Sequence, residues 1–230
     1  MPSVIRCLLP VLLVSFAVPT AARAQEDLPP LDPARVPATG ARVQSFVPNG
    51  WKVAHQISGD LNGDGRADQV VHMVPTSSDW YDPDGVSAAP AAQALVVLLA
   101  GADGRLRRGG VATRLLQPSV PQWGLQLSIR NGVLVVNQNY GMTDVTDATH
   151  RFRWDAAARR FVLIGRDRFN YHRPQEMTDP VKRSENYLTG VRLVTTGHYA
   201  ANGRYSETER RERIPRTHVA MESVDELDQD

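Results

Sequence analysis

Short apolar segments that alternate with polar residues constrain the fold of this chain more than any other feature of its sequence. Residues 51–58 alternate apolar and polar side chains, and residues 125–130 repeat the pattern. A period of two places successive side chains on opposite faces of a strand, which is typical of a sheet with one buried face. The alternation predicts that His55 lies on the apolar face of its strand. An Asn-Gly pair at 131–132 then precedes another apolar run, and this pair is the strongest short signal for a β-hairpin.

Further strand signals continue along the chain. The run Leu95–Leu99 is apolar on both faces, which suits an inner strand that is covered on two sides. Two segments could compete as helices, but Pro90 interrupts the first, at 88–94. The second, Glu207–Arg213, lacks an apolar face and is equally suited to a charged edge strand. The sequence therefore predicts an all-β, antiparallel meander of about eight to ten strands.

Charge and cysteine content exclude several classes of function. Lysine and arginine number 26 against 25 aspartate and glutamate residues, a balance that does not suit a nucleic-acid binder. The single cysteine, Cys7, lies in an N-terminal segment that we expect to be removed. Disulfides, cysteine-ligated zinc and cysteine catalysis are then excluded from the mature chain. After this segment no long apolar run follows, so we expect no transmembrane helix.

The ends of the chain differ in composition from its middle. Arg6, a short apolar run and an Ala-Arg-Ala ending have the three parts of a secretory signal peptide, which predicts cleavage after Ala24 and a secreted or periplasmic protein. The predicted organisation is a signal peptide at 1–24, a proline-rich disordered leader at 25–42, an all-β domain at 43–219 and an acidic disordered tail at 220–230.

Oxygen-bearing side chains recur at alternating positions of the segment Asp60–Asp68. They occupy positions 1, 3, 5 and 9 of a calcium-binding loop, and Gly65 stands at position 6, where the chain must turn sharply. The ligands expected from this spacing are the side chains of Asp60, Asn62, Asp64 and Asp68 and the main-chain carbonyl of Arg66.

Electrostatics favours a cation in this loop. Three carboxylates within ~5 Å of one another repel by roughly 3 kcal/mol per pair at an effective dielectric constant of ~20. Ligands that are all oxygen suit Ca²⁺ better than Zn²⁺ or Mg²⁺. Position 12 is Val71 instead of the glutamate of an EF-hand, and strand patterns flank the loop on both sides. The alternative is a plain turn of Asx and Gly residues between two strands.

The segment Asp60–Asp68, followed by Val70-Val71, resembles the calcium loop of FG-GAP and VCBS-type repeats, the blades of integrin-like β-propellers. This resemblance implies a calcium-loop hairpin in a blade-like or incomplete propeller-like meander. The chain lacks the Phe-Gly pair and the Gly-Ala-Pro triplet of those repeats and carries one such loop. Looser similarities, including Ser184–Gly190, extend to a group of uncharacterised secreted bacterial proteins and imply no activity.

Other candidate sites have ordinary structural alternatives. Asp82 and Asp84 could form a second cation site or an exposed turn. Asp144 and His150 could act as acid and base, or lie in a solvated loop. A sugar-binding platform could use the tryptophans, which otherwise pack in the core or at its rim; they are Trp51, Trp80, Trp123 and Trp154.

These observations together predict an exported, non-catalytic β protein with one structural Ca²⁺. Its expected role is a binding or envelope-associated module whose partner is a protein or glycan of the cell envelope. Two alternatives stay open: a secreted hydrolase that acts on envelope glycans or phosphoesters, and a carbohydrate-binding module.

Overall fold

The computed structural model describes residues 29–78, 92–118, 120–173 and 179–226. These residues form twelve β-strands and several short 3-10 helices, with no α-helix among them. All strand pairs are antiparallel, so the predicted all-β antiparallel fold is confirmed, with more strands than expected. The predicted signal peptide and the acidic cluster around Asp82 and Asp84 lie outside the described residues. No helix in the described part of the chain is long and apolar enough to span a membrane.

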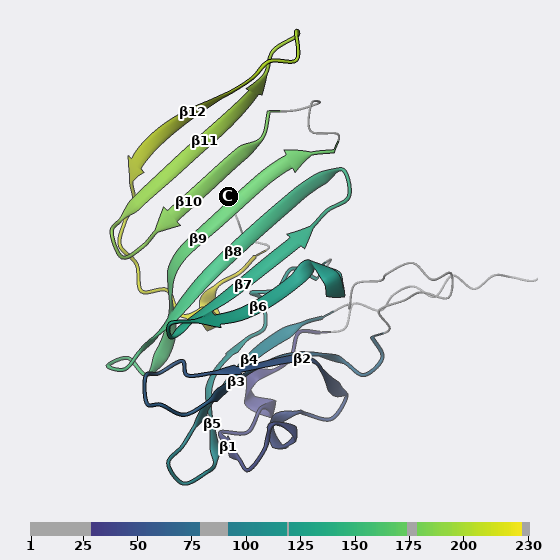
Figure 1. Cartoon of the computed structure of the whole chain (residues 1–230). Helices are drawn as coiled ribbons and strands as arrows, with labels where there is room; N and C mark the ends of the chain where they lie inside the picture. The colour runs from purple at the N-terminus through teal and green to yellow at the C-terminus, as the bar shows by residue number, and fades with distance from the viewer. Residues whose placement is uncertain (1–28, 79–91, 119, 174–178, 227–230) are drawn as a thin grey trace, which may run out of the picture.

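The strands form two sheets (Figure 1). The first has five strands in the order β1-β5-β4-β3-β2. Its members are β1 (Thr39–Gly40), β2 (Trp51–Gly59), β3 (Asp68–Pro75), β4 (Ala94–Ala100) and β5 (Leu106–Ala112). The predicted two-sided apolar strand is β4, which lies inside this sheet between β3 and β5.

The second sheet has seven strands, each paired with its neighbours in sequence. Its members are β6 (Leu125–Arg130), β7 (Val133–Tyr140), β8 (Asp144–Asp155), β9 (Arg160–His172), β10 (Val181–Asn186), β11 (Val191–Tyr199) and β12 (Tyr205–Arg213). Asn131 and Gly132 both have positive φ, 50° and 73°, as the turn between β6 and β7 requires. The charged segment Glu207–Arg213 belongs to the edge strand β12, so the edge-strand interpretation is confirmed.

The main hydrophobic core lies between the two sheets. Val70 and Val97 contribute from the five-stranded sheet, and Leu134, Phe152 and Leu163 contribute from the seven-stranded sheet. The seven-stranded sheet is wider than the sheet it packs against, and β10, β11 and β12 extend beyond it (Figure 1). We call these three strands the wing.

The predicted disordered leader is wrong from residue 31 onward. Leu31 and Val36 are buried with Val43 and Phe46 against the face of the five-stranded sheet that points away from the main core. The 3-10 helices η1 (Pro33–Arg35) and η2 (Val43–Phe46) shape this segment. Its four apolar side chains cover a sheet face that would otherwise expose valine and methionine to water, which overrides the tendency of its prolines toward an open chain.

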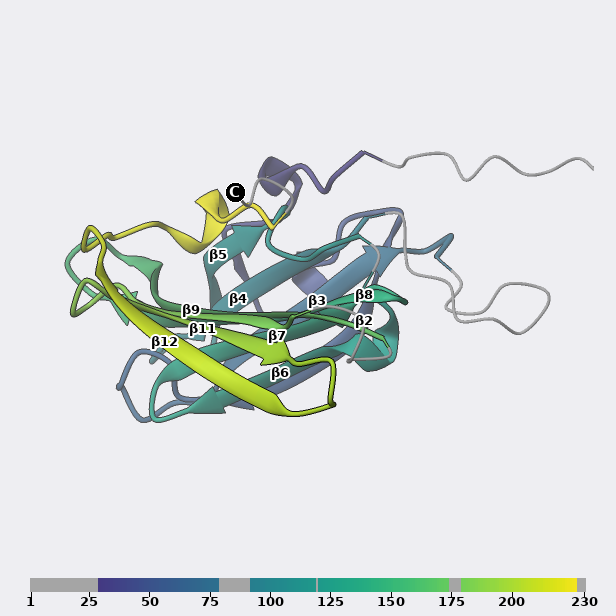
Figure 2. The same cartoon turned by 90° about the horizontal axis from the view of Figure 1, so that it is seen from above.

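The predicted acidic tail also differs from the structure. Helix η5 (Met221–Ser223) buries Met221 in the main core, and Val224 and Glu226 are buried after it. The C-terminal segment lies on one side of the seven-stranded sheet (Figure 2). Met221 and Val224 within the acidic run pack in the core, so composition alone concealed its packing.

A buried polar chain links β3 to the segment before β6. The Nε2 atom of His72 donates to Gln93 Oε1 at 2.7 Å, and Gln93 Nε2 donates to the carbonyls of Gln117 and Val120. Burial disfavours the imidazolium and lowers the pKa of His72 to about 4.

This burial predicts that stability falls as the pH falls from about 6.5 to about 4. In that window the unfolded chain binds a proton at His72 that the folded chain does not, so about 3 kcal/mol of the free energy of unfolding is lost. We expect His72→Gln to remove most of this dependence in denaturant titrations at a series of pH values. His55→Gln, at the exposed position opposite it on β2, is the control and should change the dependence only slightly, because the charge of His55 is the smallest of the causes that lower the pKa of His72. An identical pH slope in the His72 variant would contradict this account.

Candidate functional site

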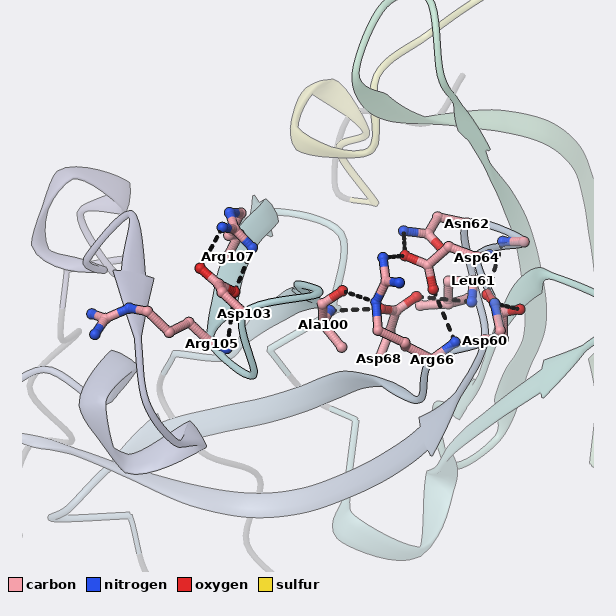
Figure 3. Close-up of polar contacts among 12 residues, drawn as sticks. Asp60, Leu61, Asn62, Asp64, Arg66, Asp68, Ala100, Asp103, Arg105 and Arg107 are labelled. Atoms are coloured by element: carbon pink, nitrogen blue, oxygen red, sulfur yellow. Dashed lines mark hydrogen bonds and ion pairs between the residues drawn. The ribbon is translucent and has the colours of Figure 1, made fainter.

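The predicted calcium loop joins β2 to β3, as the sequence indicated, and its side chains fold back over its own backbone (Figure 3). Asp60 accepts hydrogen bonds from the amides of Gly63 at 2.8 Å and Gly65 at 2.9 Å. Asn62 Oδ1 accepts from the Asp64 amide at 3.1 Å. Asp64 Oδ1 accepts from the Arg66 amide at 2.9 Å. The side chains at positions 1, 3 and 5 therefore each accept a hydrogen bond from a backbone amide of the same short loop.

Two glycines make this curl possible. Gly63 and Gly65 both have φ of +78°, a conformation that L side chains rarely adopt. Each donates its amide to the carboxylate of Asp60, and these bonds lower the pKa of Asp60, that from Gly65 most strongly. Asp60 thus stays ionised within the loop.

Asp68 has a different role at the base of the loop. Its side chain is fully buried, and its two oxygens accept from the amides of Leu61 at 2.9 Å and Ala100 at 2.8 Å. It therefore ties both the start of the loop and the end of β4 to β3. Burial raises the pKa of Asp68, and the nearby negative charges of Asp64 and Asp60 raise it further.

Arg66 supplies positive charge to the loop. Its guanidinium forms an ion pair with Asp64, and its Nε donates to the Ala100 carbonyl at 2.9 Å. The loop pattern predicts only the main-chain carbonyl of Arg66 as a ligand, and nothing in it indicates this side-chain contact. The arginine partly offsets the repulsion among the carboxylates.

In this arrangement the loop oxygens accept hydrogen bonds from protein donors and are not gathered around one ion position. Among the described residues, no group of three or more His, Cys, Asp or Glu side chains is arranged to hold a metal ion. The loop nevertheless carries an oxygen-only donor set whose members at positions 1, 3 and 5 lie inside one turn, which is the donor chemistry that Ca²⁺ requires.

The other predicted candidates do not form sites in the described residues. His150 lies in β8, fully buried, so the expectation of a solvated loop is wrong there. Asp144 is exposed at the start of the same strand and pairs with His172, not with His150. The described tryptophans form no common platform: Trp51 is buried in β2, Trp123 is exposed in η3 (Gln122–Gly124), and Trp154 packs at the core.

Sequence reasoning missed two features. Glu226, assigned to a solvated tail, is buried against His150 and Arg168. A groove across β8 to β12 collects side chains from five consecutive strands. The period-two alternation of β8 to β12 was the only signal for it, and that signal gives no strand register.

These features define a two-sheet antiparallel β protein with an Asx-rich loop at one end of the smaller sheet. No protein-family model and no curated protein matches the sequence.

Proposed function

We propose that this chain is an exported, non-catalytic calcium-binding β module in which one Ca²⁺ stabilises the β2–β3 hairpin. The observation that carries the proposal is that Asp60, Asn62 and Asp64 place their side-chain oxygens along one short loop, where each accepts a backbone amide. Calcium, when bound, supplies positive charge to a loop in which three carboxylates otherwise repel one another.

Calcium binding requires the side chains around Asp64 to rearrange. The Arg66 guanidinium and the Asn62 Nδ2 must leave Asp64, and the positive charge of Arg66 is replaced by that of the ion. Asp60, Asn62 and Asp64 would then supply side-chain oxygens and Arg66 its carbonyl. Asp68, whose two oxygens already accept backbone amides, is positioned to ligate the ion or to support the loop from below. Loops of this type in extracellular modules bind at about 10⁻⁴–10⁻³ M, which suits a permanently filled structural site.

The role as a binding module is supported by the wing. Most residues of β12 are exposed, whereas most residues of β11 are half-buried. Such a sheet extension adds area without adding to the main core, so we propose that it contacts an envelope protein or glycan. The apolar N-terminal segment supports export through the secretory route.

Replacing Asp64 tests the calcium site. We expect 10 mM Ca²⁺, about tenfold above a dissociation constant near 1 mM, to stabilise the protein by about 1.4 kcal/mol. For a domain of this size the melting temperature should rise by about 3–6 °C. Asp64→Ala should abolish the rise, as followed by circular dichroism or scanning calorimetry.

Asp103→Ala is a matched control, because Asp103 also holds a tight turn and pairs with an arginine, Arg107, but lies outside the loop (Figure 3). It should keep the full response to Ca²⁺. An unchanged response in the Asp64 variant would remove the site from this loop.

A further inference from the structure

A groove with a volume of about 480 Å³ crosses the seven-stranded sheet between β8 and β12. Its polar side chains include three carboxylates, a lysine and two threonines, and its walls carry two aromatic rings. The residues on which the argument depends are Asp147, Asp167, Phe169, Lys182, Thr195 and Tyr205. Volumes of this size are typical of pockets for small ligands.

The groove opens on the sheet face that packs against nothing else in the described chain. Along β8, Ala148, His150 and Phe152 are buried on the side of the core and of the C-terminal segment. Alternation in a strand directs Asp147 and Thr149 to the opposite face. The register places Asp167 beside Thr149 and Phe169 beside Asp147, so that one face carries the polar and the aromatic groups together.

The carboxylates of the groove are held in place by neighbouring donors. Asn137 Nδ2 donates to Asp147 at 2.7 Å. Asp167 accepts from Arg151 and from the Ser184 hydroxyl, both at 2.7 Å. A carboxylate has about four acceptor positions, so each keeps capacity for a further donor from a ligand. Oriented acceptors of this kind fit ligand hydroxyl groups.

The aromatic rings add apolar surface beside these acceptors. Tyr205 lies over Gly197, where an added Cβ would come within 2.4 Å of the tyrosine hydroxyl oxygen and 2.8 Å of Pro180. The glycine therefore lets the ring close one end of the groove. The Tyr205 hydroxyl donates to Glu207 at 2.8 Å, and its ring packs on that of Tyr199 with centroids 4.7 Å apart. Phe169 provides a second ring beside Lys182, its partner across β9 and β10.

We propose that this groove binds a neutral oligosaccharide. Sugar hydroxyls both donate and accept, which matches fixed carboxylates next to a lysine and two threonine hydroxyls, and the apolar face of a sugar ring packs on aromatic rings. An anionic ligand would meet three carboxylates. A cationic ligand would compete with Arg151 for Asp167 and would meet the positive charge of Lys182. The groove runs across five strands and is open to solvent, so it accommodates a chain better than a single enclosed sugar.

This inference rests on the proposed role as a binding module and names its ligand, but it does not depend on the calcium loop, which lies in the other sheet. The two proposals can therefore fail separately. A protein that does not respond to Ca²⁺ could still bind a glycan in the groove. A protein that binds no glycan could still be stabilised by Ca²⁺ through Asp64.

Titration calorimetry of the full chain tests the proposal. The neutral probes are maltotetraose, cellotetraose and tetra-N-acetylchitotetraose. Each is added up to about 10 mM, a range that detects a dissociation constant near 1 mM. At least one neutral probe should bind. Thr195→Trp, which fills the groove, should abolish the binding, and Asp147→Ala should weaken it at least about tenfold.

Matched controls separate the groove from general damage to the sheet. Thr196→Trp places the same ring on the opposite face of β11 and should keep the binding. Arg210→Gln, at an exposed position of β12 opposite Val194 and thus on the other face of the sheet, should keep it also. Circular dichroism checks that each variant folds. The proposal is overturned if no neutral probe binds, if spermine or tetragalacturonate binds the groove in preference, or if Thr195→Trp binds as well as the parent.

Discussion

Replacing Glu226 with alanine is expected to lower the free energy of unfolding by about 3–5 kcal/mol, although the sequence places this residue in an acidic terminal run. Its Oε1 accepts from the Tyr140 hydroxyl at 2.9 Å and from Arg168 at 2.5 Å. Its Oε2 lies 3.2 Å from Nε2 of the buried His150. Removal of the carboxylate leaves the largely buried guanidinium of Arg168 without its counter-charge, and this uncompensated charge is the main cost.

Chemical denaturation of the parent and the variant measures this effect directly. Glu222→Ala is the matched control, because Glu222 lies in the same C-terminal segment and is exposed. It should change the free energy of unfolding by less than about 0.5 kcal/mol. A loss below about 1 kcal/mol for Glu226→Ala would show that the C-terminal segment does not anchor the seven-stranded sheet.

Glu185→Ala is the second change with a large expected effect, and it acts on the wing. The Glu185 carboxylate is almost fully buried between Arg166 of β9 and Arg192 of β11, and it also accepts from the Tyr187 hydroxyl at 2.6 Å. Removing it leaves two arginines facing each other, so we expect a loss of about 3–5 kcal/mol. Because this cluster connects three strands, the loss should be concentrated in β10 to β12.

The stabilisation by Glu185 depends on pH, because the folded structure shifts the pKa of its carboxyl group. Burial alone would raise it, but the hydrogen bond from Tyr187 and the charges of Arg166 and Arg192 bring it below its ordinary value. A carboxylate with a lowered folded-state pKa contributes stability above its unfolded value, and this contribution is lost as the pH falls through the folded-state pKa.

Hydrogen exchange read by mass spectrometry locates the effect of Glu185→Ala. Amides of β10, β11 and β12 should exchange faster while those of β3 and β4 keep their protection. Glu209→Ala, at an exposed position of β12, should leave the pattern unchanged. Uniform acceleration over both sheets would contradict a local role for this cluster.

The fold class was predictable because it depends on local patterns. A few neighbouring residues are enough to indicate the local structure in three places: the Asn131-Gly132 turn, the two-sided apolar run of β4 and the alternation of β6. Packing between distant segments carries no such local signal. Leu31 and Val36 read as part of an open proline-rich leader because the sheet face that they cover is formed by residues far along the chain.

Strand irregularities were a second limit. The alternation in β2 placed Trp51, Val53 and His55 on one face, but the register shifts between Val53 and His55. Trp51 and Val53 pack on the N-terminal side of the sheet, whereas His55 is exposed. A one-residue bulge moves every later side chain to the other face, and the sequence gives no sign of it.

The sequence predicts some features of the candidate site and not others. The position of the Asp60–Asp68 loop between two strands follows from the sequence, because its glycines and Asx residues have local roles. The contact of Asp68 with Ala100 and the pairing of Arg66 with Asp64 depend on β4 and on side-chain placement. For the same reason the groove across β8 to β12 could not be predicted, because the register of five strands decides which of its residues lie side by side.

Calorimetric titration of Ca²⁺ into the chelator-treated protein tests calcium binding by the Asp60–Asp68 loop most directly. We expect a single binding event with a dissociation constant of about 10⁻⁴–10⁻³ M for Ca²⁺ and a much weaker response to Mg²⁺. The absence of any binding heat, with an unchanged melting temperature at 10 mM Ca²⁺, would contradict it and leave the loop as a turn closed by its own hydrogen bonds and by Arg66.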